Sequence, residues 1–279
     1  MRAWVLNLDA DHELARPEGY SPRHEVRARV ATLAARIEGL VPPGDIRIDE
    51  QSDASGLSGR AWCPTPSALQ WLERSGATLP PFPPFDVVRR VNHRAFCAEL
   101  GQTLDGAAFV RDRSELEQRI AAGTEWLLKR PHGFAGSGRR RVHSGSLDDD
   151  TKRWLDASLR ADGLQVEPWV ERLADFSVHG FIALDGELTL GEPCLQECDA
   201  RGQWLSARRV EPGELRDDER RALLSEAELS ARALHRAGYF GPFGIDAYRH
   251  RNGFNPRSEI NARYTMAWAI GMGDARPDL

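Results

Sequence analysis

Lysine is nearly absent from this chain of 279 residues, in which Lys129 and Lys152 are the only two. Arginine supplies the rest of the 37 basic residues, a skew that a GC-rich genome explains better than chemistry does. Positive charge is not in excess either, because the net charge is -5. Nucleic acids and anionic membranes attract proteins through a dense positive field, so neither is an expected partner. Each lysine becomes a candidate functional residue.

Cysteine is also scarce, and its four occurrences, Cys63, Cys97, Cys194 and Cys198, form no CxxC pair. Cys194 and Cys198 have the spacing of two zinc ligands, but no nearby histidine or cysteine pair completes a set of four. Because no secretory signal peptide is recognised at the start, we expect free, buried thiols in a cytoplasmic protein. No apolar run approaches the roughly 20 residues of a membrane helix, so no membrane partner is expected.

The elements that are present indicate an α/β opening followed by α+β structure. Residues 3–8 (AWVLNL) are typical of a buried strand, and 23–38 place apolar residues at helical spacing. The run PPFPPF at 80–85 indicates a rigid connection. Beyond it, we expect Asn92 to cap a helix that reaches Leu100, and residues 217–238 to form an amphipathic helix ended by Gly238.

A β-hairpin is predicted near the C-terminus, where Asn252 and Gly253 lie between the runs FGPFGIDAYRH and NPRSEINARY. This dipeptide is the strongest short-range hairpin signal, because a type I′ turn needs a positive φ at both central residues. Pairing counted outward from a two-residue loop sets Asp246 opposite Glu259. Pro256 leaves an alternative open, since a bulge there would shift the register.

The predicted hairpin carries a candidate metal site. Strand side chains alternate, so Asn261, Arg257 and Arg263 share the face of Asp246 and Glu259. Two carboxylates directly across a ladder repel each other unless a positive charge lies between them. A hard divalent cation with oxygen ligands from Asp246, Glu259 and Asn261 would satisfy all three, and Mg²⁺ is the natural candidate. The alternative is a surface cluster in which Arg257 and Arg263 neutralise the carboxylates.

A candidate phosphate-binding loop lies in WLLKRPHGFAGSGRRRV, residues 126–142. Lys129 ends an apolar strand, and the small residues of HGFAGSG allow the backbone to approach a phosphate and present N–H groups to it. The segment is neither a Walker A loop nor a dinucleotide GxGxxG motif. An ordinary glycine-rich hairpin is the alternative.

The order of these motifs resembles the ATP-grasp superfamily of carboxylate–amine or carboxylate–thiol ligases. An apolar strand ending in Lys129 is followed by the glycine loop, by VEPWV, by Asp175, and by Asp246 with the motif Glu259-Ile260-Asn261, and the resemblance covers about residues 85–272. It implies that ATP lies between two α+β subdomains, a small one at 86–165 and a large one at 166–279. A short N-terminal α/β region at 1–85 would precede them.

The resemblance also implies nucleotide contacts. Lys129 would contact the α and β phosphates, while the loop at 133–138 closes over the triphosphate. The hinge against adenine would be 167–170, where Glu167 can accept from the amino group of the base and Trp169 either stacks or packs. Asp175 matches the acidic position that binds ribose hydroxyls. The nucleotide-binding residues implied are Arg94, Lys129, His132, Gly133, Ala135, Gly136, Ser137, Gly138, Glu167, Trp169, Val170 and Asp175.

The resemblance also implies which residues bind the metal and which take part in catalysis. Asp246, Glu259 and Asn261 match the metal ligands, for Mg²⁺ with Mn²⁺ as an alternative. Arg263 matches a position that in several such ligases holds the phosphate or acyl phosphate, so Arg263 and Lys129 are the implied catalytic residues.

The chain departs from the family pattern at two positions. Arg94 stands where the family usually has a second ATP-contacting lysine, and a guanidinium is not equivalent to an ammonium. Gly244 stands where D-alanine–D-alanine ligase-like members often have an arginine. Of the histidines, His132 and His179 are expected to line the cleft, and His179 fits a structural role better than that of a base.

The implied reaction forms an acyl phosphate from ATP and a small-molecule or peptide carboxylate, which an amine or thiol then attacks. An ATP-grasp kinase that leaves the phosphate on a hydroxyl acceptor is one alternative. A nucleotide-binding module without turnover, suggested by Arg94, is another. The identity of the substrates and the oligomeric state stay open, with a homodimer among the alternatives.

Overall fold

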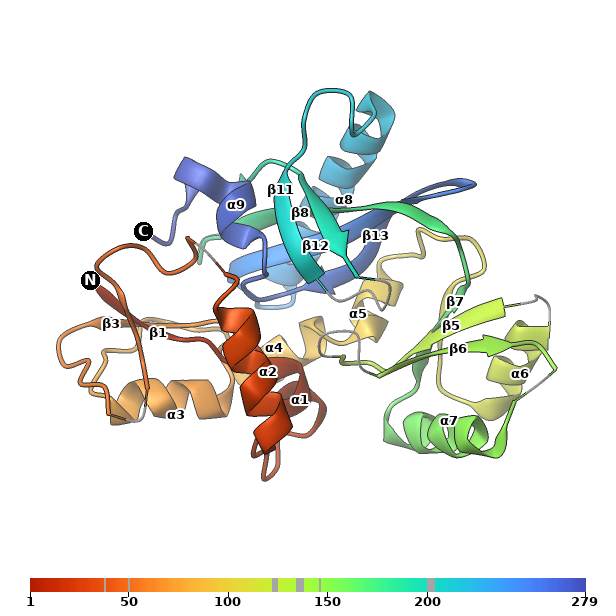
Figure 1. Cartoon of the computed structure of the whole chain (residues 1–279), viewed down its shortest axis with the longest axis horizontal. Coiled ribbons are helices and arrows are strands. Elements are labelled where there is room, and N and C mark those ends of the chain that lie inside the picture. Colours follow the sequence, from red (N-terminus) through yellow and green to blue (C-terminus); the bar gives the residue numbers. More distant parts are fainter. Residues whose placement is uncertain (38, 50, 122–124, 134–137, 146, 200–203) are drawn as a thin grey trace.

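The computed structural model of the chain describes residues 1–279 apart from 38, 50, 122–124, 134–137, 146 and 200–203. Three separate sheets follow one another along the sequence and form three lobes around a common centre (Figure 1). The fold is α+β with an α/β lobe at the N-terminus, as the sequence predicted. The exact domain boundaries stay a prediction.

The N-terminal lobe is a small parallel sheet with helices beside it. Its strands pair in the order β2-β1-β3, and both pairings are parallel. Parallel strands need a crossover connection, which the first two helices supply between β1 and β2. The elements are β1 (Arg2–Val5), α1 (Ala10–Ala15), α2 (His24–Ala34), β2 (Ile46–Arg47), β3 (Ser58–Ala61) and α3 (Pro66–Arg74). The predicted strand at 3–8 and helix at 23–38 are present but shorter.

The small lobe is an antiparallel sheet of order β4-β7-β5-β6. Its elements are β4 (Ala108–Val110), α6 (Arg113–Ala121), β5 (Glu125–Lys129), β6 (Arg139–His143), α7 (Asp149–Ala161) and β7 (Leu164–Pro168). The two helices cover one face of the sheet (Figure 1) and form a core of their own with it. Buried Leu116 of α6, Leu155 of α7 and Leu128 of β5 belong to that core.

The large lobe is an antiparallel sheet of order β11-β10-β8-β12-β13, with β9 paired to β8. Its strands are β8 (Arg172–Ile182), β9 (Leu188–Leu190), β10 (Cys194–Cys198), β11 (Trp204–Arg209), β12 (Gly241–His250) and β13 (Gly253–Asn261). The remaining helices are α4 (Phe85–Val91), α5 (Arg94–Glu99), α8 (Asp217–Arg236), α9 (Trp268–Met272) and the 3₁₀ helix Gly273–Ala275. Gly238 follows the end of α8 with a φ of 90°, as predicted. Across the part of the chain described, no helix is long and apolar enough to cross a membrane.

The N-terminal lobe and the large lobe share one core. Trp4 and Trp62 of the N-terminal lobe belong to the same buried cluster as Ile245 and Trp268. The ring of Tyr264 connects the two sides, because its centroid lies 5.3 Å from that of Trp4 and 4.9 Å from that of Trp268. Buried aromatic side chains dominate core energetics, so these two lobes form one packed unit.

The junction between α4 and α5 is tied to the end of β13. Asn92 Oδ1 accepts from the Ala262 N–H at 2.9 Å, and Asn92 Nδ2 donates to the Ala262 carbonyl at 3.2 Å. The predicted cap at Asn92 is wrong, because Asn92 ends α4 and His93 caps α5 by accepting from Ala95 N–H at 3.0 Å. This clamp fixes Arg94 beside the strand that carries the predicted metal ligands.

Candidate active site

The hairpin of β12 and β13 sets Asp246 directly opposite Glu259, as predicted. The predicted turn is wrong by one residue, because His250 pairs with Gly253. A register shift between Asp246 and Tyr248 then restores the expected pairing, and it lies opposite the stretch that contains Pro256. The bulge left open as an alternative is thus present, and it brings the two carboxylates together.

The two carboxylates are held by donors. Asp246 Oδ1 accepts from Gln196 Nε2 and Asp246 Oδ2 from Asn261 Nδ2, both at 3.0 Å, while Glu259 Oε1 accepts from Arg94 Nη2 at 2.8 Å. Burial, together with the charge of Glu259, raises the pKa of Asp246 to about 6. Burial acts to raise the pKa of Glu259 as well, but the charges of Arg94 and Lys129 outweigh it and lower that pKa, so this carboxylate stays ionised.

Arg257 and Arg263 do not neutralise the two carboxylates, contrary to the alternative of a surface ion-pair cluster. Arg257 is buried away from the pair, where its Nε donates to Glu226 Oε2 at 2.8 Å. Arg263 Nη2 donates to Asp11 Oδ2 at 2.8 Å, and Nη1 donates to Asn261 Oδ1. Of the described residues, Arg94 is the cation that is ion-paired with Glu259.

The donor set fits a divalent cation. Asp246, Glu259 and Asn261 offer two carboxylates and an amide oxygen, and oxygen ligands are what Mg²⁺ prefers. In the described residues, no group of three or more His, Cys, Asp or Glu side chains could hold a metal ion. The candidate site therefore depends on Asn261 as its third protein ligand, with the rest of the coordination left to water and phosphate.

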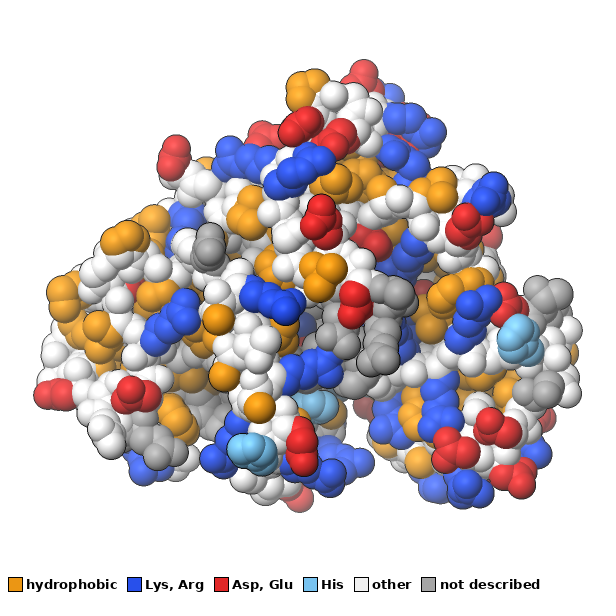
Figure 2. All heavy atoms as spheres, viewed as in Figure 1, with side chains coloured by type: hydrophobic (Ala, Val, Ile, Leu, Met, Phe, Trp, Pro, Cys, Tyr) orange, Lys and Arg blue, Asp and Glu red, His pale blue; other side chains and the backbone are white. Residues whose placement is uncertain are grey.

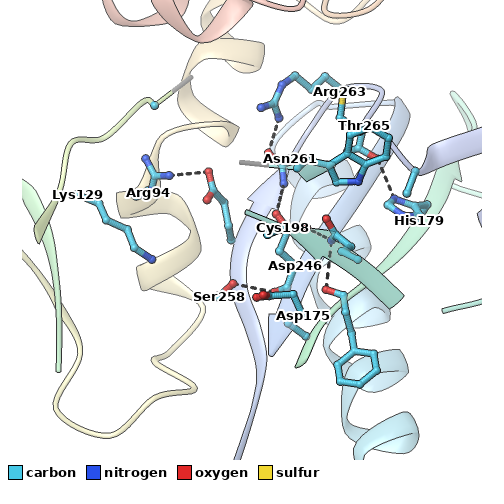
Figure 3. A pocket seen from close by; sticks show the side chains of 18 of the residues that line it. Arg94, Lys129, Asp175, His179, Cys198, Asp246, Ser258, Asn261, Arg263 and Thr265 are labelled. Atoms are coloured by element: carbon cyan, nitrogen blue, oxygen red, sulfur yellow. Dashed lines mark hydrogen bonds and ion pairs between the residues drawn. The ribbon is translucent and has the colours of Figure 1, made fainter. Parts of the chain in front are cut away.

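A cleft of about 260 Å³ is lined by these carboxylates and by the cations Lys129 and Arg94. Figure 3 shows Lys129 and Arg94 reaching from one side towards Asp246 and Asn261 on the other. Of the predicted site residues, those that line the cleft are Arg94, Lys129, Gly133, Gly138, Asp175, Asp246, Glu259, Asn261 and Arg263.

Lys129 forms a buried ion pair. Its Nζ lies 2.7 Å from the carboxylate of Glu167 on the neighbouring strand β7, and both side chains are less than a tenth exposed. Burial lowers the pKa of Lys129 while the charge of Glu167 opposes that shift. Glu167 lines a smaller hollow beside the cleft, with Arg257 and Gln165. The predicted contact between Glu167 and adenine stays a prediction.

The other predicted nucleotide residues lie around the rim. Trp169 is 41% exposed, with the Arg141 guanidinium 4.0 Å from its ring centroid, and Val170 packs on the Leu104 cluster. Asp175 is ion-paired with Arg172 at 3.0 Å.

The glycine loop is described only at its two ends. Gly133 and Gly138 line the cleft, and Gly138 has a φ of 77°. Both ring nitrogens of His132 are buried and have no hydrogen-bond partner in the described part of the chain, and His132 lines a neighbouring groove rather than the cleft. The expectation that His132 lines the cleft is therefore wrong. Ala135, Gly136 and Ser137 lie outside the described residues.

His179 explains the departure at Gly244. The two residues face each other between β8 and β12, and a Cβ at position 244 would lie 2.8 Å from His179 Nδ1. His179 lines the cleft and is held by Ser177 Oγ at 3.0 Å and Thr265 Oγ1 at 2.9 Å. Burial lowers its pKa to about 3, so the ring is neutral and structural, as the sequence suggested.

Sequence reasoning missed several residues at the cleft. Arg172 lines it with its guanidinium 4.0 Å from the Tyr248 ring centroid, and Gln196 of β10 binds Asp246. Cys198 lines it too and is exposed, which contradicts the expected burial of every thiol. Asp11 of α1 pairs with Arg263 across 252 positions. No spacing rule predicts a contact between residues that far apart in the sequence.

Comparison with known proteins gives a fold and no family assignment. No family model matches the chain, and no curated protein matches it.

Solved structures do match. N5-carboxyaminoimidazole synthetase from Staphylococcus aureus, complexed with ADP, is 12% identical with a TM-score of 0.54, covering 95% of this chain and 70% of that chain. D-alanyl-alanine synthetase A from Vibrio cholerae is 11% identical with a TM-score of 0.55, covering 93% and 87%. Biotin carboxylase from Campylobacter jejuni, in a β,γ-ATP complex, is 14% identical with a TM-score of 0.60, covering 77% of this chain and 50% of that one. At such identities the likeness establishes the fold alone.

Proposed function

We propose that this chain, which has the ATP-grasp fold, is an ATP- and Mg²⁺-dependent ligase that activates a carboxylate for attack by an amine or thiol. One observation carries the proposal: an acidic wall on β12 and β13 and a cationic wall formed by Lys129 and Arg94 line one cleft, and Arg94 reaches Glu259 at 2.8 Å. Triphosphate together with a divalent cation complements both walls at once. The matched synthetases and carboxylase, two of them in nucleotide complexes, support this class of reaction.

Unused hydrogen-bond donors support phosphate binding. The Nε groups of Arg94 and Arg263 are buried and have no hydrogen-bond partner among the described residues. An unpaired buried donor is costly, and an anionic oxygen from a ligand would satisfy it. Arg94 is also held from the other side, because its Nη1 donates to the Arg130 carbonyl at 2.6 Å. Both guanidinium groups are thus fixed in place before a ligand binds.

The proposed chemistry has two steps. A substrate carboxylate oxygen attacks the γ-phosphorus, the bond to the ADP oxygen breaks, and an acyl phosphate forms. An amine or thiol then attacks the acyl carbon, and inorganic phosphate leaves. Mg²⁺ held by Asp246, Glu259 and Asn261 would neutralise charge on the phosphates. Lys129, Arg94 and Arg263 orient the transferring group and stabilise its negative charge, so positioning and electrostatics supply most of the catalysis.

The finer assignments belong to the same proposal. Adenine lies against 167–170, the ribose hydroxyls contact Asp175, and the loop at 133–138 covers the triphosphate. Mn²⁺ substitutes for Mg²⁺, the first substrate is a small-molecule or peptide carboxylate, and the protein acts in the cytoplasm.

The test is ATP turnover in the presence of Mg²⁺ with a panel of carboxylate and amine or thiol pairs. Wild type is expected to release ADP and inorganic phosphate with one pair, whereas Glu259→Gln and Lys129→Ala are each expected to lose about 100-fold or more, as when a single transition-state stabilising group is removed. ATP turnover at the wild-type rate in both variants would contradict the proposed mechanism. A stable phosphorylated product without free phosphate would replace the ligase with a kinase.

A further inference from the structure

A second hollow of about 640 Å³ lies next to the cleft, and we call it the arginine groove. One side is the segment that follows α1, with Arg16 and Arg23, and the other is the small lobe, with Arg130 and His132. Figure 2 shows Lys and Arg side chains on both sides of the gap between the lower end of α1 and α2 and the small lobe. The proposed ATP site uses none of these side chains.

The groove and the cleft lie on the two sides of one wall. Lys129 lines the cleft and Arg130 lines the groove, as expected for successive residues that leave a strand on opposite faces. Gly133 and Gly138 line both hollows. The backbone N–H of Arg130 donates to the Gly138 carbonyl at 2.8 Å, so the backbone at Arg130 is tied to one end of the glycine loop. A ligand in the groove therefore has its far end near the loop that borders the cleft.

Positive charge in the groove is not balanced by the protein. Within the described residues, Arg16 and Arg23 have no ion pair, and Glu18 is the single carboxylate among the side chains that line the groove. Arg130 has no acid partner there either, because its Nε donates to Ser158 Oγ at 2.9 Å and its guanidinium lies 5.1 Å from the Trp154 ring centroid. Burial and then the charge of Arg16 lower the pKa of Arg130, which indicates that the two cations repel each other.

His132 supplies a second, independent indication. Its Nδ1 and Nε2 are both buried, and neither has a hydrogen-bond partner among the residues that the structure describes. Buried polar atoms are normally hydrogen-bonded, so an orphaned pair on the wall of a hollow marks a place where a ligand or water binds. The segment opposite is held in place, because Tyr20 Oη donates to Asp9 Oδ2 at 2.5 Å. Burial lowers the pKa of His132 to about 3, so the neutral ring offers one N–H donor to such a ligand.

We propose that the arginine groove binds an anionic group, a carboxylate or a phosphate, on the amine or thiol substrate, an inference that rests on the proposed function. The carboxylate to be activated must lie inside the cleft, against the phosphates. A molecule whose anion lies in the groove can reach the cleft past Gly133 and Gly138, which line both hollows, and so bring its nucleophile to the activated carboxylate. Arg16 and Arg130 bind the anion, and planar guanidinium groups suit carboxylate and phosphate alike.

The test measures anion binding without turnover. The full chain is saturated with Mg²⁺ and a non-hydrolysable ATP analogue, so that the cleft is filled, and is titrated calorimetrically with inorganic phosphate and, separately, with succinate. Wild type is expected to bind one equivalent of one of them, and the variant Arg16→Gln/Arg130→Gln is expected to bind about tenfold more weakly or less, because charge-assisted hydrogen bonds are lost. Tighter binding of succinate assigns a carboxylate, and tighter binding of phosphate assigns a phosphate.

The matched control is Arg153→Gln, which removes an arginine whose side chain is 72% exposed on α7 of the same lobe. It is expected to bind like wild type. Arg16→Gln alone serves if the double variant does not fold, since Arg16 is exposed. Equal binding by wild type and the Arg16 variants, or no binding by wild type, would overturn the proposal. If the anion binds in an arginine-dependent way but the protein turns over ATP with no substrate pair, the ligase function is refuted and the anion site is still supported.

Discussion

The two walls of the cleft belong to differently built parts of the molecule. The carboxylates lie on β12 and β13 of the large lobe, whose core continues into the N-terminal lobe through Trp4, Tyr264 and Trp268. Lys129 and the glycine loop lie on the small lobe, which has a separate core. The proposed metal ligands therefore belong to the larger packed unit, and the proposed phosphate contacts belong to a lobe with a core of its own.

Arg94 joins the two parts. Its Nη2 binds Glu259 on the large lobe, while its Nη1 binds the Arg130 carbonyl on the small lobe. The arginine that departs from the expected lysine is suited to this, because a planar guanidinium binds two acceptors in fixed directions. A lysine at position 94 would give up one of the two contacts.

The largest effect that separates the two cores is expected from Trp268→Ala and Leu128→Ala. Both side chains are fully buried, and such truncations cost about 3 kcal/mol or more. Trp268→Ala is expected to increase amide hydrogen exchange in the N-terminal and large lobes together, whereas Leu128→Ala increases exchange in the small lobe alone. Uniform exchange across all three lobes in both variants would show that the cores are not separate.

A somewhat smaller effect is expected at the ion pair of the small lobe. Lys129→Met leaves Glu167 buried without its partner, which typically costs about 3 kcal/mol. Thermal unfolding is the measurement, and Lys129→Met/Glu167→Gln is the control, because it removes both charges and should recover much of the loss. If the single and double variants unfold at the same temperature, the pair does not stabilise the small lobe.

The large lobe is expected to respond to acid through His179. Burial lowers the pKa of His179 to about 3 in the folded protein. Below pH 6.5 the histidine is therefore protonated in the unfolded chain but stays neutral in the folded protein. Stability should therefore fall as the pH drops from about 6.5 towards 3, by about 1.4 kcal/mol per unit. His179→Gln should flatten that slope in denaturant titrations, while the same change at exposed His143 should not. An unchanged slope in His179→Gln would contradict the assignment.

The smallest effect is expected at the tip of the hairpin. Arg251 and Glu171 form an ion pair with side chains 69% and 58% exposed, where water and salt screen the attraction. Arg251→Ala should leave both the unfolding midpoint and ATP turnover unchanged. A clear loss of either would mean that the tip contributes to the site.

The sequence predicts the large sheet and its carboxylates because their signals are local. The alternation of the strands and the position of the turn predict that Asp246 lies opposite Glu259, and it does. The real turn comes one residue earlier than predicted, and a bulge between Asp246 and Tyr248 offsets that difference. The pairing of Lys129 with Glu167 depends on which strands of the small sheet become neighbours, and the contacts of Arg263 with Asp11 and of Asn92 with Ala262 depend on how the lobes pack. These contacts join polar residues that lie far apart in the sequence, and no spacing pattern predicts them.

The central claim is that the two walls hold one nucleotide, with a divalent cation on the carboxylate side. Calorimetric titration of ATP with and without Mg²⁺ tests it most directly, on wild type, Asp246→Asn/Glu259→Gln and Lys129→Ala. Wild type should bind ATP more tightly with Mg²⁺, the carboxylate variant should lose that dependence, and Lys129→Ala should bind more weakly under both conditions. ATP binding that is absent in wild type, or the same in all three proteins, would contradict the account.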